Sequence, residues 1–169
     1  MKYRNSQQAG FSLIEVLVAL LVLGIGMLGM GKMLMVSMKS NGTAYANTQA
    51  MNQANAMLDR IRANRAIALS GTSSNYSLSA LTASSAYGAG PNCLTAACSA
   101  ENMASSDVAN WLANLSASNG LPSGQGSINF GSVNNQTSVV IKVQWDDTVA
   151  QKALNETQNP VSVTITSVL

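Results

Sequence analysis

The sequence predicts an α+β fold in which one long N-terminal helix packs against a small antiparallel sheet, beside a short helix and a loop-rich head. Three patterns lead to this prediction. Residues 11–38 form an apolar stretch long enough for a membrane helix. Residues 39–68 continue that stretch with a single apolar stripe. Residues 69–169 contain three segments in which apolar and polar side chains alternate, which is the period of a half-buried strand.

The start of the chain predicts a single membrane pass. Residues 1–10 carry Lys2 and Arg4 and no acidic side chain. Basic segments beside a membrane helix stay in the cytoplasm, so we expect the N-terminus inside the cell and the head outside the inner membrane, in the periplasm. An ordinary secretory signal peptide fits less well, because no small-residue cleavage pattern follows the apolar stretch.

Glu15 is the one acidic residue between residues 11 and 38. A charged side chain at the centre of a bilayer costs about 2.5–3.5 kcal/mol on insertion scales. A signal peptide or a plain membrane anchor leaves this cost unexplained. Two interpretations remain open from the residues: Glu15 lies at the headgroup boundary close to water, or it has a partner of opposite charge.

The apolar helix is expected to continue to about Ala68, because apolar residues beyond residue 39 recur at three-, four- and seven-residue steps. The predicted stripe consists of Ala44, Met51, Ala54, Leu58 and Ile61. Three arginines stand near its end, namely Arg60, Arg62 and Arg65. Cations are favoured at a helix C-terminus, so these side chains either solvate this face or contact a neighbouring subunit.

The head is expected to begin with a Ser-, Ala- and Gly-rich loop over residues 70–92. Ser105, Ser106 and Asp107 offer caps for a following helix. Its apolar residues are Val108, Trp111, Leu112 and Leu115. Residues 121–126 have turn chemistry. The alternating apolar residues of the three predicted strands are Ile128 and Phe130, then Val139, Ile141, Val143 and Trp145, then Val161, Val163 and Ile165.

The composition argues against catalysis. The chain has no histidine, which removes the triads and the acid–base chemistry that depend on imidazole. Its two cysteines cannot complete a tetrahedral zinc site by themselves. Asp146 and Asp147 follow the second predicted strand and are typical of a turn. We therefore expect no enzyme activity, no metal and no cofactor, and a net charge of +2 predicts no nucleic-acid partner.

The run Gly10-Phe11-Ser12-Leu13-Ile14-Glu15, placed between a short basic leader and an apolar helix, resembles the cleavage motif of type IV prepilins and pseudopilins. The resemblance implies a type IV pilin-like fold. It also implies that residues 1–10 are a leader, that a prepilin peptidase cuts after Gly10, and that the new amino terminus at Phe11 is methylated. Glu15 then acts in assembly by pairing with the amino terminus of a neighbouring subunit in the filament.

Cys93 and Cys98 lie in the part of the chain that we expect in the periplasm, where oxidising conditions favour a disulfide. Their spacing differs from that of the C-x-x-C redox motif. We expect a structural disulfide, which contributes about 2 kcal/mol for so short a loop in the chain-entropy model.

The head narrows the resemblance. The cysteine pair, the helix with Asp107 and Trp111, the L-P-x-G-x-G run of residues 121–126 and the V-x-W-D run of residues 143–146 are similar to the PilV type of minor pilin. This resemblance implies a low-abundance subunit that joins other minor pilins and the major pilin at the pilus assembly platform, primes or caps the filament, and passes from the inner membrane to the pilus. The alternatives are a minor pseudopilin of a type II secretion system and, less favoured, an adhesin or DNA-uptake pilin.

Overall fold

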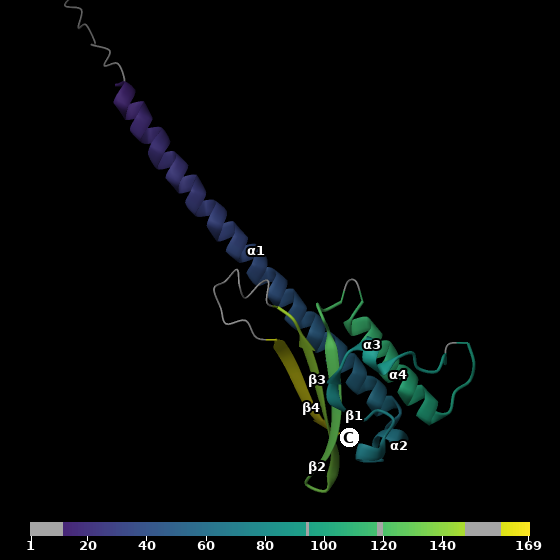
Figure 1. Ribbon diagram of the computed structural model, residues 1–169. Helices are drawn as coiled ribbons and strands as arrows, with labels where there is room; N and C mark the ends of the chain where they lie inside the picture. Colours follow the sequence, from purple (N-terminus) through teal and green to yellow (C-terminus); the bar gives the residue numbers. More distant parts are fainter. Residues whose placement is uncertain (1–11, 94, 118–119, 148–159) are drawn as a thin grey trace, which may run out of the picture. The chain divides into compact units, whose positions relative to one another are not determined.

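The chain divides into two compact units, Met1–Lys39 and Ser40–Leu169, and the boundary lies inside its longest helix. The computed structural model describes residues 12–93, 95–117, 120–147 and 160–169 (Figure 1). Gly10 and Phe11, where cleavage and methylation are expected, lie outside the described residues. Glu15 and both cysteines lie within them.

The described part of the first unit is the first half of helix α1 (Leu13–Ala63). Every residue from 12 to 39 is exposed, so the described part of this unit has no core of its own. A helix satisfies all the backbone hydrogen bonds in its interior from within the segment, which is what an apolar segment needs where no water is present. This apolar half of α1 therefore suits a lipid or protein environment better than an aqueous one.

The second unit is an α+β head built on the rest of α1. Its elements in chain order are α2 (Arg65–Ala68), the 3₁₀ helix η1 (Gly71–Ser73), β1 (Leu78–Thr82), α3 (Ser84–Tyr87), α4 (Ala100–Leu115), β2 (Gln125–Val133), β3 (Gln136–Trp145) and β4 (Val161–Val168). The four strands form one antiparallel sheet in the order β1-β2-β3-β4. Helices α3 and α4 lie between β1 and β2 in the chain, and α4 runs along the second half of α1 (Figure 1).

The central hairpin has a continuous register. Strands β2 and β3 pair from Gln125 with Gln144 to Val133 with Gln136, and a two-residue turn joins them. Both turn residues, Asn134 and Asn135, have positive φ values of 52° and 65°. A two-residue hairpin with left-handed residues matches the right-handed twist of its strands, and asparagine tolerates this conformation better than most residues.

One hydrophobic core joins the sheet, α4 and the second half of α1. Alternate residues of β3 supply its sheet side, and all of them are buried: Val139, Ile141, Val143 and Trp145. The apolar residues predicted for the helix at 108–115 supply the opposite side, and all four are buried in α4. The α+β prediction and these buried faces are therefore confirmed.

Trp111 joins three elements of the core. Its indole N–H donates to the backbone carbonyl of Gln53 in α1 at 3.0 Å. Its six-membered ring lies directly against Gly126 of β2, where a Cβ atom would collide with Cη2 and Cζ3. Gly126 is therefore needed in β2 because only a residue without a side chain leaves room for the ring.

The buried face of α1 consists partly of other residues than those predicted. Ala54, Leu58 and Ile61 are buried as expected, but Ala44 and Met51 are exposed. The stripe is completed instead by Ala50 and Met57. Ala44, Met51 and Leu58 follow one another at seven-residue steps along one edge of this face, and only Leu58 lies deep enough in the head to be covered.

Helix α1 ends at Ala63, five residues before the expected end at Ala68. Asn64 interrupts it with φ −105° and ψ 48°, and α2 then resumes for a single turn. The side-chain amide of Asn64 donates to the carbonyl of Ala100 at 2.7 Å. This bond links the interruption to the start of α4, a contact that no local pattern in the sequence reports.

Two further boundaries differ from the prediction. The segment expected to be a loop over residues 70–92 contains β1, so the sheet has four strands where three were predicted. Helix α4 begins at Ala100 rather than near residue 108, and its N-cap is Ser99, whose hydroxyl accepts from the backbone N–H of Asn102 at 3.3 Å. Asp107 therefore lies inside the helix and is available for a tertiary contact.

The fit of Trp111 against Gly126 makes a testable prediction. We expect Gly126→Ala to lower the free energy of unfolding by about 1–3 kcal/mol, because the added Cβ displaces the ring and strains the core. Gly131→Ala is the matched control on the same strand, since its Cβ would meet only the rotatable hydroxyl of Ser138, at 3.2 Å. Urea unfolding of the detergent-solubilised chain compares the two variants, and equal losses would contradict the packing described for Trp111.

Candidate functional site

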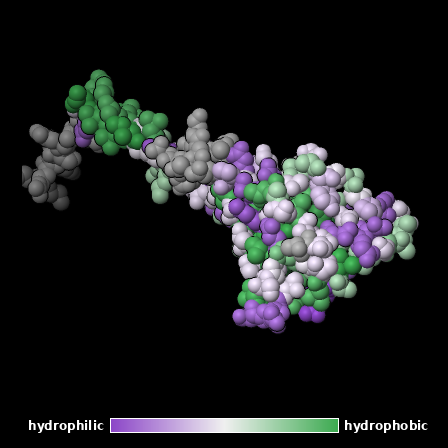
Figure 2. Space-filling model, turned by 60° about the horizontal axis from the view of Figure 1, so that its bottom comes forward, coloured by the Kyte–Doolittle hydropathy of each residue, from purple (hydrophilic) through white to green (hydrophobic). Residues whose placement is uncertain are grey.

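The first half of α1 presents an apolar surface on all sides. Leu13 is 85% exposed and Leu28 is 79% exposed, and none of the helix's most apolar 18-residue window is buried. By length and composition this helix could cross a membrane. Figure 2 shows its apolar side chains as a largely green surface. A surface of this size is far larger than a soluble monomer normally exposes, so lipid or other protein must cover it.

Glu15 lies in the first turn of α1. Its backbone N–H donates to the carbonyl of Ser12 at 3.0 Å, which starts the helix. A carboxylate is favoured at this end of a helix because the first backbone N–H groups carry partial positive charge. The face that it shares is otherwise apolar and consists of Val16, Ala19, Leu20 and Leu23. No basic side chain shares that face among the residues that the structure describes.

The charges of this helix define an uncharged interval. After Glu15 the next charged residue is Lys32, so residues 16–31 carry none. At 1.5 Å per residue the two charged positions lie about 26 Å apart along the helix axis. The hydrocarbon layer of a bilayer is about 30 Å thick, so the interval between the two charges nearly matches a membrane span.

Four glycines lie within this interval, namely Gly24, Gly26, Gly29 and Gly31. A Cβ atom at any of them would meet nothing within 4 Å. Packing inside the chain therefore does not require them. Glycines on a membrane helix allow close approach of a second helix, and each lowers the helix propensity by about 1 kcal/mol relative to alanine.

A buried polar contact anchors the head to the end of the long helix. The phenol of Tyr76 is fully buried and donates to Oδ2 of Asp107 at 2.8 Å. Nη1 of Arg60 donates to the backbone carbonyl of the same aspartate at 3.3 Å. Burial raises the pKa of Tyr76 far above its usual value, and the hydrogen bond to the Asp107 carboxylate acts in the same direction.

Two of the three clustered arginines make contacts within the head. Arg60 contacts α4 as described, and Nη2 of Arg62 donates to the hydroxyl of Ser167 in β4 at 2.9 Å. Nη1 of Arg62 also lies 3.8 Å from Oδ1 of Asp59, at an exposed position. These arginines tie α1 to α4 and β4, an internal role that neither interpretation of the sequence had considered.

The two sequence motifs of the head, residues 121–126 and 143–146, lie next to each other at the end of the sheet. The backbone N–H of Asp146 donates to the carbonyl of Pro122 at 2.8 Å, so the turn before β2 lies beside the end of β3. Oδ2 of Asp147 accepts from the hydroxyl of Thr43 in α1 at 3.1 Å. The two aspartates thus hold backbone and helix together, which is a structural role.

Cys93 and Cys98 are joined by a disulfide with an S–S distance of 2.06 Å, the pairing that the sequence predicted. The loop leading into it passes over α4. Gly90 lies so close to α4 that a Cβ there would come within 2.8 Å of the Cβ of Ala109 and 2.9 Å of the carbonyl oxygen of Ser105. The disulfide thus directly follows a segment whose backbone is packed on a helix.

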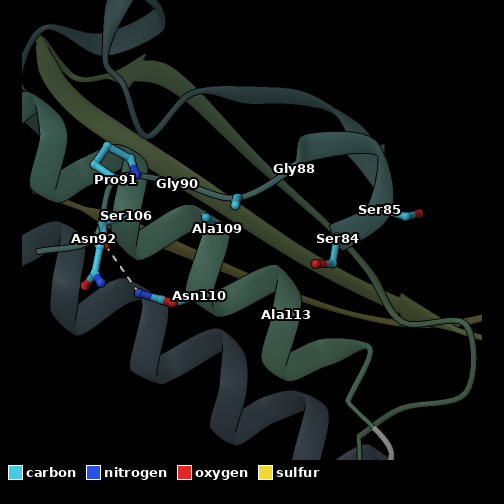
Figure 3. Close-up of a pocket in the computed structure, with 11 residues that line it drawn as sticks. Ser84, Ser85, Gly88, Gly90, Pro91, Asn92, Ser106, Ala109, Asn110 and Ala113 are labelled. Carbon is cyan, nitrogen blue, oxygen red and sulfur yellow. Dashed lines mark hydrogen bonds between the residues drawn. The ribbon is translucent and has the colours of Figure 1, made fainter. Parts of the chain in front are cut away.

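An open cavity of about 520 Å³ lies beside this loop. Ser84 and Ser85 of α3 line one end, Gly88 to Asn92 form a wall, and α4 forms the floor with Ser106, Ala109, Asn110 and Ala113 (Figure 3). The amide of Asn110 donates to the hydroxyl of Ser106 at 3.3 Å. No charged side chain lines this cavity, so it offers hydroxyl and amide groups but no acid–base or nucleophilic pair.

Comparison with known protein families matches two consecutive parts of the chain. Residues 5–31 match the prokaryotic N-terminal methylation motif, and residues 33–109 match the family described as type IV pilin Tt1218. The chain carries a type IV pilin domain. No curated protein and no solved structure matches it.

The two matches explain the division of the molecule. The methylation motif covers the expected cleavage site, Glu15 and most of the apolar segment, which fits membrane anchoring and localisation in a pilus. The type IV pilin match runs from residue 33 in α1 to residue 109 in α4, and it includes the Tyr76–Asp107 contact. Type IV pilins are structural proteins that assemble with other pilins after processing by a prepilin peptidase, and the two matches support a pilin involved in the assembly of a pilus or pseudopilus.

The contact between Tyr76 and Asp107 predicts that stability depends on pH. Tyr76→Phe should lower the free energy of unfolding by about 1.5–3 kcal/mol at neutral pH, because Asp107 loses a buried donor. Because the pKa of Tyr76 is raised in the folded state, the contribution of its neutral phenol to stability is fully present below pH 10. This contribution falls as the pH rises above 10, by up to about 1.4 kcal/mol per pH unit. The difference between wild type and variant should therefore narrow above pH 10.

Urea unfolding at pH 7, 10 and 11 measures this difference. Tyr45→Phe is the matched control, since Tyr45 is 70% exposed and should leave stability unchanged at each pH. If the difference in unfolding free energy between wild type and Tyr76→Phe stays constant or widens above pH 10, the pKa of Tyr76 is not raised as described.

The disulfide makes a second prediction. In chain purified from membranes without reductant, alkylation should label neither Cys93 nor Cys98, and both should react after reduction. Peptide mass spectrometry measures the labelling. Full labelling before reduction would show that the bond is absent from the head.

Proposed function

We propose that the chain is a minor pilin of the PilV type, which is processed by prepilin peptidase and joins other minor pilins to prime or cap a type IV pilus. The observation that supports this most strongly is the fully exposed apolar helix with a single acid in its first turn, matched as a methylation motif. The head motifs at residues 121–126 and 143–146, which lie side by side, support the subtype.

The position of Glu15 explains how one helix can serve two environments. If Lys32 lies at the outer boundary of the hydrocarbon layer, Glu15 lies about 4 Å inside the inner boundary. A carboxylate at that depth reaches the headgroups, so the membrane form tolerates it at small cost. The cost rises when the subunit is extracted into a filament, where headgroups and water are absent.

A partner for Glu15 in the filament follows from processing. Cleavage after Gly10 creates an amino group at Phe11 that also needs a counter-ion when it is buried. Pairing between Glu15 of one subunit and this amino group of its neighbour neutralises both charges. The pairing is satisfied at a single axial offset between the helices, so it sets the register of the subunit.

The proposal requires processing at the expected bond. Intact-mass analysis of chain isolated from pilus-forming cells should give a mature protein that begins at a methylated Phe11. A protein that still begins at Met1, or one cut beyond residue 30, would contradict the proposal.

The proposal also predicts the effect of Glu15→Ala. The variant should accumulate normally in the inner membrane but be absent from sheared pili, because the partner amino group stays buried and unpaired at a cost of about 3–5 kcal/mol. Cleavage after Gly10 should persist, since Glu15 lies beyond the scissile bond. Leu17→Ala is the control, as it shortens a side chain of the same helix on the face opposite Glu15. The ratio of pilus-bound to membrane-bound chain is measured by immunoblot.

Recovery of Glu15→Ala in pili at the wild-type ratio would refute the pairing and leave Glu15 as a headgroup-level residue. A type II pseudopilin shares the N-terminal elements, and it would be recovered with a secretion apparatus rather than with pili.

A further inference from the structure

We propose that the outer edge of β4 is an interaction surface that binds an extended edge strand of a neighbouring pilin head. This inference rests on the proposed function, since it takes the partner to be another subunit of the assembly. β4 is an outermost strand of the sheet in the part of the chain that the structure describes. Such a strand offers a row of unpaired backbone groups to another strand.

The register identifies the groups that face outward. The backbone N–H of Leu169 donates to the carbonyl of Thr137 at 2.9 Å, one step beyond the pairing of Val168 with Ser138. Hydrogen-bonded and non-bonded pairs alternate along an antiparallel ladder. The N–H and C=O groups of Ser162, Thr164 and Thr166 therefore point away from β3, toward the open edge.

The sequence of β4 lacks the features that protect edge strands. Natural sheets discourage strand addition with lysines, prolines, bulges or short edges. β4 has eight residues, VSVTITSV, without a charge, a proline or a glycine, and its pairing with β3 continues without interruption over all eight. Its residues have high β-propensity. This edge is therefore built to accept a strand.

The inner face of β4 is only partly covered by the head. Val161, Val163 and Ile165 are half-buried, whereas the residues that they oppose on β3, namely Trp145, Val143 and Ile141, are buried almost completely. The helices therefore bury the inner side chains of β3 more completely than those of β4. An added strand would extend this apolar face and bury the three side chains further, which adds apolar contact to the backbone hydrogen bonds.

The topology fixes the direction of the partner strand. In a sheet of four antiparallel strands, β1 and β4 run in opposite directions. Subunits anchored in one membrane by the same helix have the same orientation. A like-oriented neighbour can therefore present an edge strand such as β1 antiparallel to β4, which is the more stable of the two pairings. The occupant that the observations favour is thus an edge strand of a second pilin head.

The test places a photo-crosslinking residue, p-benzoylphenylalanine, at Thr166 of the full-length chain in pilus-forming cells. Adducts are isolated from the membrane and pilus fractions and are mapped by mass spectrometry. We expect an adduct to an edge-strand residue of another pilin chain. The yield should fall about tenfold with Thr164→Pro, which removes an outward N–H, and should persist with the matched control Thr164→Ala, which keeps it.

Protease resistance of the head, measured in both variants, shows whether each one folds. If Thr164→Pro does not fold, Thr164→Lys replaces it, because a lysine at an open edge opposes strand addition and leaves the pairing with β3 intact. Several results would overturn the inference: no adduct, an adduct equally strong in both variants, an adduct to a protein other than a pilin, or an adduct within residues 148–159 of the same chain.

The strand pairing at β4 can fail while the minor-pilin proposal holds, and the experiment distinguishes the two. Chain that is recovered in sheared pili without edge adducts would reject the strand pairing and leave the minor-pilin proposal standing. Chain that is absent from pili would reject the minor-pilin proposal, and the adducts in the membrane fraction would still decide whether β4 pairs with a pilin strand.

Discussion

The contact on which the head most depends is that of Trp111 with α1 and β2. One side chain hydrogen-bonds the carbonyl of Gln53 and places its ring against Gly126, so it sets the spacing of α1, α4 and the sheet together. The stripe of α1 that faces this core is rich in small residues, which let the helix approach closely. The same helix begins as the apolar segment with Glu15, so one backbone element belongs both to the folded head and to the surface that other molecules must cover.

Four of the charged side chains of the described head hold together segments that are distant in the sequence. Charged residues make up only 9% of the chain. Arg60, Arg62, Asp107 and Asp147 each make a contact between elements that lie far apart in the sequence. In the part of the chain that the structure describes, the apolar half of α1 is exposed and β4 is an edge strand, and both are the kind of surface that a second subunit satisfies.

The sequence predicted what depends on periodicity and missed what depends on tertiary contacts. Alternation located β2, β3 and β4, and helical spacing located the buried face of α4. β1 was missed because its five residues, LSALT, mix small polar and apolar side chains without a clear period. The interruption at Asn64 and the Tyr76–Asp107 contact were missed because each depends on a partner more than 30 residues away. Of the candidate site residues, the cysteine pair was predicted from spacing and compartment, whereas the role of Glu15 involves a second chain and stays a prediction.

The pairing of Glu15 with a neighbouring amino terminus is tested most directly by joining the two groups covalently. A hydrophobic carbodiimide applied to intact pili activates a carboxylate in an apolar environment and links it to an amine in direct contact. The pairing predicts a covalent dimer whose junction peptide joins Glu15 of this chain to the first residue of an adjacent pilin, and no such dimer for Glu15→Ala. Wild-type pili that contain the chain but yield no such junction, or yield one only within a single chain, would contradict it.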